Sequence, residues 1–366
     1  MKILVLRLGA IGDIIRTMPA VKYINENVFK GKAEIHWIAE SHNSVILEGL
    51  PYVHKVISLP RKEWQKKFFS FSIFKTVSEI RNLIKNLRKE NYDIAVDFHG
   101  IFKSGLLSHL SKAKLRLGYD KKNCKELNHF FNNKHIIPLN NRINRYKKIF
   151  ALTSYFDEKS ELTESLFDNL FGISVTDKKN VDPFISVILR TTGFESPTII
   201  GIQPSVSLFG RNKEWPEKNY SELCSSIIKK IHNSIIVFNW WGDNEYEKVG
   251  RIINSVILTA EEKKRFFLMP SFSFRERAYF FSKLSAFITP DTGPMYIASS
   301  AGTNVLALFG PSDPELYAPF GNHYYIVKEN IECSPCRKRS CKKLLCMSLI
   351  RPDAVLNKLK EILKNN

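Results

Sequence analysis

The sequence predicts an α/β protein of two Rossmann-like domains, each with a mainly parallel sheet, that face each other across a cleft. Short apolar runs alternate with amphipathic segments along the whole chain, which is the order that produces parallel sheets covered by helices. The first apolar run leads directly into a glycine-rich turn and a helical segment. The length of 366 residues exceeds what one core usually serves and suits two domains of about 150–200 residues each.

In the first half, apolar runs predict buried strands at residues 2–8, 33–39, 55–59, 92–98 and 115–118. Helical spacing of apolar residues predicts helices at 14–25, 78–90, 101–110 and 141–156. Asp13 stands where the first helix begins. There it either caps the helix or offers an ionised carboxylate at the carboxyl edge of the sheet. His99 ends a strand and is interpreted as a packed histidine rather than a catalytic one.

In the second half, strands are predicted at 198–203, 235–239, 286–289 and 305–309, and helices at 217–231, 245–254, 274–283 and 295–301. Asp291, Thr292 and Gly293 come directly before one of these helices. The first turn of a helix carries unpaired N–H groups and a partial positive charge, so this end suits a phosphate. The expected domains are 1–185 and 186–350, followed by a closing helix at 351–366.

The formal net charge of +19 favours an anionic partner, which can be nucleic acid, a membrane surface or a phosphorylated substrate. No apolar run is long enough to span a membrane. The amino-terminal run lacks a signal-peptide cleavage site and is interpreted as the first strand, so a cytoplasmic location is expected. Cations and aromatic rings alternate at residues 61–74. This segment is either a solvated loop leading into a helix or a surface for phosphates and acyl chains.

Four cysteines near the end follow a C-x2-C-x4-C-x4-C pattern within residues 333–346. Four sulfurs at this density can hold Zn²⁺ or an iron–sulfur cluster. They can equally be reduced thiols that pack a small lobe, and the spacing of the second pair is unusual for a metal site. The residues concerned are Cys333, Cys336, Cys341 and Cys346.

Four motifs are distributed along nearly the whole chain: RLGAIGDIIRTMPAV at 7–21, YDIAVDFHGIFKSGLL at 92–107, KEWP at 213–216 and DTGPMYIASSAGTNVLALFGPSDP at 291–314. Together they resemble the ADP-heptose:lipopolysaccharide heptosyltransferases, which are inverting glycosyltransferases of family 9 with the GT-B fold. The resemblance implies transfer of L-glycero-D-manno-heptose from ADP-heptose to the Kdo or heptose residues of the lipopolysaccharide inner core. It also implies an enzyme peripheral to the inner membrane that needs no cofactor for catalysis and does not bind nucleic acid.

The resemblance implies site residues as well. Asp13 matches the general base, and Lys213 matches the lysine that steadies the leaving ADP. The positions on the donor side are Ser205, Ser207, Lys213, Glu245, Asp291, Thr292, Gly293 and Tyr296. Cations in the first half match the region that receives the anionic acceptor, namely Arg61, Lys62, Lys103, Lys125 and Arg145.

The sequence also departs from the family pattern. Tyr296 stands where the family has a histidine, and the family's D-x-Q-G reads Asp97-Phe98-His99-Gly100. These differences leave two other hypotheses open, a glycosyltransferase for another nucleotide sugar and an inactive relative that binds nucleotide or lipid.

The segment 61–74 generates a prediction about the acceptor. Replacing Arg61 and Lys62 by glutamine is expected to raise the KM for the lipid acceptor more than the KM for the donor, because these cations match the acceptor side. Steady-state kinetics with each substrate varied in turn measures the two constants. An equal rise in both would contradict the assignment.

Overall fold

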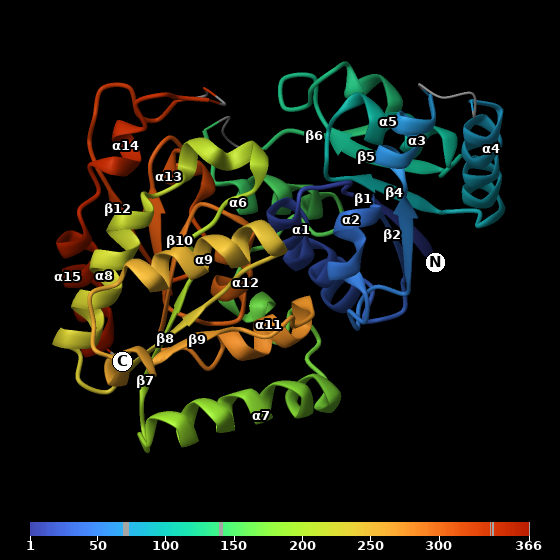
Figure 1. Cartoon of the computed structure of the whole chain (residues 1–366). Helices are drawn as coiled ribbons and strands as arrows, with labels where there is room; N and C mark the ends of the chain where they lie inside the picture. Colours follow the sequence, from blue (N-terminus) through green and yellow to red (C-terminus); the bar gives the residue numbers. More distant parts are fainter. Residues whose placement is uncertain (69–72, 139–141, 337, 339, 366) are drawn as a thin grey trace. The chain divides into compact units, whose positions relative to one another are not determined.

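The computed structural model describes residues 1–68, 73–138, 142–336, 338 and 340–365. Contacts between residues divide the chain into two compact units, Met1–Leu166 and Phe167–Asn366. Within the described residues, each unit holds one six-stranded sheet, and every strand pair is parallel. The α/β class with two Rossmann-like units is therefore confirmed (Figure 1).

Both sheets have the same strand order. The first is β3-β2-β1-β4-β5-β6 and the second is β12-β11-β10-β7-β8-β9. Numbered from the start of each unit, both follow the doubly wound order, in which the chain changes direction along the sheet between the first and fourth strands. The strands are β1 (Lys2–Leu6), β2 (Glu34–Glu40), β3 (Lys55–Leu59), β4 (Ile94–Asp97), β5 (Leu115–Tyr119), β6 (Lys134–Ile136), β7 (Thr198–Ile202), β8 (Ser234–Phe238), β9 (Phe266–Leu268), β10 (Ala286–Pro290), β11 (Val305–Phe309) and β12 (Tyr324–Lys328).

Helices connect successive strands in both units. In the first unit they are α1 (Ile11–Tyr23), α2 (Ser41–Ser44), α3 (Arg61–Phe68), α4 (Ile73–Lys89), α5 (Phe102–Leu110) and α6 (Arg145–Phe150). In the second unit they are α7 (Val175–Thr192), α8 (Glu217–Lys230), α9 (Asp243–Ser255), α10 (Ala260–Lys263), α11 (Phe274–Phe281), α12 (Gly293–Ser300), α13 (Pro314–Tyr317), α14 (Leu345–Ser348) and α15 (Pro352–Lys364). Among the described residues, no helix has both the length and the apolar character that crossing a membrane requires.

The strands that the sequence did not predict are β6, β9 and β12, and each lies at the edge of a sheet. Edge strands are covered on fewer sides, so their residues are mostly half-buried or exposed. With three residues each, β6 and β9 are too short to give a clear pattern, whereas the apolar residues 324–327 of β12 were a usable signal. Helix α7 was also not predicted. It contacts α11 through the ring of Phe184, whose centroid lies 5.5 Å from that of Phe280, and through polar pairs such as Asp177 with Arg275 at 2.6 Å. The domain limits of 1–185 and 186–350 remain a prediction.

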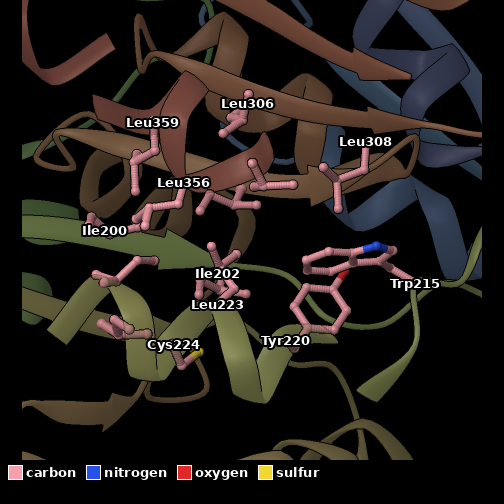
Figure 2. Close-up of a cluster of buried hydrophobic side chains, with 14 of the residues drawn as sticks. Ile200, Ile202, Trp215, Tyr220, Leu223, Cys224, Leu306, Leu308, Leu356 and Leu359 are labelled. Carbon is pink, nitrogen blue, oxygen red and sulfur yellow. The ribbon is translucent and has the colours of Figure 1, made fainter. Parts of the chain in front are cut away.

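The core of the second unit lies between its sheet and the helices α8 and α15 (Figure 2). Trp215, from the KEWP motif, is fully buried there. Its indole N–H donates to the carbonyl of Ile350 at 2.9 Å, and its ring meets Tyr220 edge-on with centroids 4.7 Å apart. The tryptophan thus ties the segment before α8 to the segment before α15.

This packing generates a prediction about stability. Trp215→Ala is expected to destabilise the second unit by about 3–5 kcal/mol, because it leaves a large cavity in the core. Urea unfolding followed by circular dichroism measures the loss. The control is Ile257→Ala, since Ile257 is 82% exposed, and a Trp215 variant as stable as that control would contradict the packing argument.

Candidate active site

Parallel sheets bring the ends of non-consecutive strands together, and in both units this gathers the motif residues. In open α/β sheets, ligands bind beyond the carboxyl ends of the strands, where the chain changes direction. In the first sheet this point lies between β1 and β4, which are followed by the Asp13 turn and by Asp97-Phe98-His99. In the second sheet it lies between β7 and β10, which are followed by Gln203–Ser205 and by Asp291–Gly293. Each unit therefore carries a polar group at its switch point.

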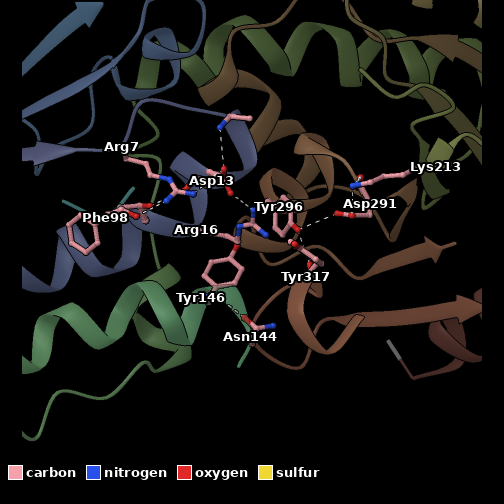
Figure 3. Close-up of polar contacts among 12 residues, drawn as sticks. Arg7, Asp13, Arg16, Phe98, Asn144, Tyr146, Lys213, Asp291, Tyr296 and Tyr317 are labelled. Atoms are coloured by element: carbon pink, nitrogen blue, oxygen red, sulfur yellow. Dashed lines mark hydrogen bonds and ion pairs between the residues drawn. The ribbon is translucent and has the colours of Figure 1, made fainter. Parts of the chain in front are cut away.

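Asp13 sits in the first turn of α1 and is held by two arginines (Figure 3). Arg7 contacts one carboxylate oxygen at 2.9 Å, and Arg16, one turn further along the helix, contacts the other. Both arginines are buried. Arg7 also donates to the carbonyl of Phe98 at 2.5 Å, so the ion triad links the β1 turn to the β4 turn.

The charge state of Asp13 follows from this pairing. Burial acts to raise the pKa of the Asp13 carboxyl, but the guanidinium groups of Arg7 and Arg16 outweigh it and hold the pKa well below its ordinary value. Asp13 is therefore ionised throughout the physiological pH range. An ionised carboxylate can accept a proton, although the two arginines make it a weaker base than a free aspartate.

Asp97 organises the turn after β4. It is fully buried and accepts hydrogen bonds from the backbone of His99 at 2.9 Å and of Gly100 at 3.0 Å. It also accepts from Ser104 at 2.9 Å and Asn128 at 2.6 Å. Burial raises the pKa of the Asp97 carboxyl, and this effect outweighs the hydrogen bonds, which lower the pKa. Gly100 adopts φ +69°, and a side chain there would meet the ring of Tyr119 at 2.9 Å, so this turn requires glycine.

His99 faces the β1 turn, where its Nδ1 accepts a hydrogen bond from the backbone N–H of Leu8 at 3.3 Å. Burial, reinforced by the charge of Arg7, lowers the pKa of His99 to about 3. The ring is therefore neutral at physiological pH and carries its proton on Nε2. In this tautomer it can donate a hydrogen bond but not serve as a base, so the structure is compatible with the packed interpretation.

The cations predicted on the acceptor side all follow the carboxyl ends of first-unit strands. They come after β3, β4, β5 and β6 and comprise Arg61, Lys62, Lys103, Lys125 and Arg145. Lys62, Lys103 and Lys125 are exposed. Arg61 differs, because its Nε pairs with Glu40 at 2.5 Å. Part of the segment 61–74, namely residues 69–72, lies outside the described residues.

In the second unit, Asp291 stands between a lysine and a tyrosine (Figure 3). The ammonium group of Lys213 lies 2.6 Å from one carboxylate oxygen. The hydroxyl oxygen of Tyr296 lies 3.2 Å from the other oxygen and 2.8 Å from the carbonyl of Tyr317, and these two acceptors share its single proton. Tyr296 is only 3% exposed. It therefore supports Asp291 from behind, whereas Lys213 is 30% exposed and open to a ligand.

The phosphate-binding features predicted for this unit lie around the same point. Thr292 is the N-cap residue of α12 and Gly293 is its first residue. The positive end of this helix therefore lies just beyond the carboxyl end of β10, where a ligand can meet it. Ser205, after β7, is buried, and its hydroxyl has no hydrogen-bond partner among the described residues. Ser207 is exposed at the start of the next turn.

Glu245 is held in place by a series of hydrogen-bonded side chains. The sequence analysis did not predict this series. The Glu245 carboxylate accepts from Gln203 at 3.2 Å and from the backbone of Trp241 at 2.9 Å. Gln203 is bonded in turn to Asn239, and Asn239 to Arg277. Burial raises the pKa of Glu245 and lowers that of Arg277 to about 10. The available signal was the position of Gln203 and Asn239, which are polar residues directly after buried apolar strands.

The four cysteines of the carboxyl-terminal segment are free thiols. The backbone N–H of Cys336 donates to Pro311 at 2.8 Å. A side chain at Gly310 would meet the sulfur of Cys346 at 3.1 Å, so both residues lie against the end of β11. Across the described part of the chain, the group with three potential ligand atoms within 4.8 Å of one another is Glu34, His36 and Glu90, which Lys2 and Lys55 already neutralise.

Comparison with known proteins assigns this fold and these motifs to a family. The family model described as glycosyltransferase family 9 (heptosyltransferase) matches residues 80–346. The chain belongs to this family and is a glycosyltransferase, as its motifs predicted.

Individual members of the family align with this chain over most of its length. The chain is 27% identical to lipopolysaccharide heptosyltransferase 1 of Campylobacter coli, with 99% of each chain covered. It is 21% identical to lipopolysaccharide heptosyltransferase 1 of Escherichia coli K12, covering 90% of this chain and 93% of the relative. The solved structure of E. coli heptosyltransferase WaaC with ADP-2-deoxy-2-fluoro heptose superposes with a TM-score of 0.73 at 18% identity, over 99% of both chains. This likeness shows a shared fold and confirms the predicted GT-B architecture.

The environment of His99 generates a prediction about pH. Its pKa in the folded protein, about 3, lies below the ordinary value of 6.5. The unfolded chain therefore takes up a proton that the folded chain does not, and stability present above pH 6.5 is lost as the pH falls towards 3. From about pH 7 to about pH 5 we expect His99 to contribute a loss of about 1–2 kcal/mol.

The variant His99→Gln should lose less stability over the same pH interval, because glutamine does not titrate. Urea unfolding at both pH values measures the difference, with exposed His109→Gln as the matched control. Identical pH slopes for the parent and His99→Gln would show that His99 is not held neutral.

Proposed function

We propose that this protein transfers L-glycero-D-manno-heptose from ADP-heptose to a Kdo or heptose hydroxyl of the lipopolysaccharide inner core. The observation that carries the donor assignment is the arrangement of Lys213, Asp291 and the start of α12 at the switch point of the second sheet. A half-buried lysine beside a helix amino terminus suits a diphosphate. The unpartnered hydroxyl of Ser205 adds a donor at the end of the adjacent strand β7.

In the proposed reaction the acceptor oxygen attacks the anomeric carbon, the bond from that carbon to ADP breaks, and the configuration inverts. Asp13 takes the proton from the acceptor hydroxyl. As the new bond forms, this oxygen becomes far more acidic than a carboxylic acid, so a carboxylate with a lowered pKa still accepts the proton. Lys213 balances the charge that develops on ADP, which is why we propose catalysis without a metal ion.

The acceptor is anionic, and the exposed lysines beyond β3, β4 and β5 of the first unit suit it. Its lipid portion lies in a membrane, so we propose a cytoplasmic enzyme that associates peripherally with the inner membrane. Nucleic acid is not part of the proposal, because none of the features at the two switch points favours a base or a duplex.

Tyr296 favours a second candidate, a glycosyltransferase with another nucleotide sugar. Tyrosine replaces the family histidine, and its hydroxyl is bonded to Asp291 and to the Tyr317 carbonyl. A changed support behind Asp291 can alter which sugar the site accepts. An inactive relative is the third reading.

The cysteine segment has two interpretations, a site for Zn²⁺ or an iron–sulfur cluster and a set of reduced thiols that pack a small lobe. A tetrathiolate site would have a structural role, because thiolates close the coordination sphere. Elemental analysis of the purified protein decides it. About one zinc ion per chain, or iron with matching sulfide, would support the site, and metal at background level would contradict it.

Calorimetric titration with ADP and then with ADP-heptose, in the presence of a chelator, tests the function. We expect both to bind, the sugar nucleotide more tightly, because the sugar adds contacts to a site that needs no metal. Binding of ADP alone would favour another donor sugar. Binding of neither would overturn the donor assignment.

A prediction about Asp13 tests the mechanism. Asp13→Asn keeps the size of the side chain and one acceptor oxygen for the arginines but cannot take a proton, so we expect kcat to fall by about 10²–10⁴-fold. Donor binding should stay close to that of the parent, because the donor residues belong to the second unit.

The matched control is Asp93→Asn, which removes a carboxylate just before β4, at the opposite end of the same sheet. Transfer assays with radiolabelled donor measure kcat for both variants. Parental turnover in Asp13→Asn would remove Asp13 from the role of base.

A further inference from the structure

The first unit exposes an apolar surface ringed by lysines, which we call the 102–137 patch. Its apolar members include Leu127, which is 62% exposed, and Phe130, which is 73% exposed. The full set of exposed apolar residues is Phe102, Leu127, Phe130 and Ile137. The exposed cations are Lys103, Lys121, Lys122, Lys125 and Lys134. Large apolar groups rarely gather on a surface unless something covers them.

Contacts show that the two chain segments of the patch lie together. The backbone N–H of Lys125 donates to Gly100 at 2.8 Å, and that of Phe102 donates to the Glu126 carboxylate at 3.2 Å. The ring of Phe102 meets that of Phe131 with centroids 5.2 Å apart. The start of α5 therefore touches the segment after β5.

The third part of the patch is β6. His135 on this strand contacts the carbonyl of His129 at 2.9 Å, and His129 packs against the ring of Phe130 with centroids 4.2 Å apart. Lys134 and Ile137 belong to the same short stretch of chain as His135. The apolar residues and the lysines thus come from three chain segments that contact one another.

Leu127 is exposed by a backbone conformation that is unfavourable for a leucine. Glu126 and Leu127 have φ of 54° and 58°, a left-handed conformation that residues with a side chain adopt reluctantly. Asn128, the next residue, is buried and anchored to Asp97 at 2.6 Å and to the Ile101 carbonyl at 2.7 Å. The chain is thereby forced to turn at Leu127, and the leucine gains no burial in return.

The charge around these apolar groups has one dominant sign. The acidic residues within the segment 120–137 are Asp120 and Glu126. Asp120 accepts from the backbone of Lys122 at 3.1 Å and from Asn123 at 2.6 Å, and Glu126 accepts from Phe102. The five lysines therefore present a net positive rim, which attracts an anionic surface.

We propose that the 102–137 patch docks the protein on an anionic phospholipid bilayer, with its apolar side chains inserted among the lipids and its lysines against the headgroups. The proposal deepens the membrane association in the proposed function and rests on it only for the choice of membrane. Lysines at the rim can keep their ammonium groups at headgroup level while their stems lie along apolar surface. Phe102 and Phe130 offer aromatic faces to a base, but Leu127 and Ile137 do not, so a lipid surface covers more of the patch than single-stranded nucleic acid would.

Flotation with vesicles tests the proposal without any transfer reaction. The probes are vesicles of phosphatidylethanolamine and phosphatidylglycerol at roughly three to one, and vesicles of phosphatidylcholine. We expect binding to the anionic vesicles that weakens as salt rises from about 0.1 M to about 0.5 M. Equal binding to both kinds of vesicle, or binding to neither, would overturn the proposal, whether or not ADP-heptose proves to be the donor.

Two variants test the apolar and the electrostatic contributions to vesicle binding separately. Leu127→Ser with Phe130→Ser should weaken binding roughly tenfold or more, through lost apolar insertion. Lys121→Gln, Lys122→Gln and Lys134→Gln together should weaken it roughly a hundredfold, at about fivefold for each lysine. None of these residues belongs to the proposed donor or acceptor set.

Matched controls come from the second unit. Ile257→Ser removes an apolar side chain that is 82% exposed, and Lys218→Gln, Lys229→Gln and Lys230→Gln remove three exposed lysines. Both controls should bind vesicles like the parent, and circular dichroism establishes that each variant is folded. Losses of equal size in the patch variants and the controls would show a general charge effect and contradict a defined patch.

Discussion

The order of the parallel strands is the constraint on which both polar groups depend. Each sheet places its first and fourth strands side by side at the centre, so the turns after them meet although they are far apart in the chain. Arg7 bridges the two turns in the first unit, through Asp13 and the Phe98 carbonyl. In the second unit the same topology brings Gln203 and Ser205 beside Asp291. A different strand order with the same strands would separate these residues.

The aspartates at the two switch points have different bonding partners. Asp13 is held by two guanidinium groups, which keep it ionised. Asp291 is held by one ammonium group and one phenol, so its lysine stays open to a further anion. The first arrangement suits a group that must accept a proton, and the second suits a group that orients a cation. This difference in partners, more than the presence of a carboxylate in each motif, gives the two aspartates distinct chemistry.

Much of the fold was predictable because central strands are covered on both faces and therefore appear as continuous apolar runs. The edge strands β6 and β9 have three residues each, which is too short a pattern to identify, and α7 contacts α11 through both polar pairs and the ring of Phe184. Among the site residues, Asp13, Lys213 and Asp291 stand in recognisable motifs. Asn239 and Arg277 do not, since their importance comes from a buried chain of hydrogen bonds that joins three separate elements.

The α/β class, the family and the motif residues at the ends of β1 and β10 follow from the sequence alone, because apolar periodicity and local turn chemistry are properties of neighbouring residues. The pairing of Arg7 and Arg16 with Asp13, the burial of Tyr296 next to Asp291 and the exposure of Leu127 and Phe130 follow from the fold. These facts depend on which distant segments meet and how much water each group loses, and neither can be read from residues that are adjacent in the chain.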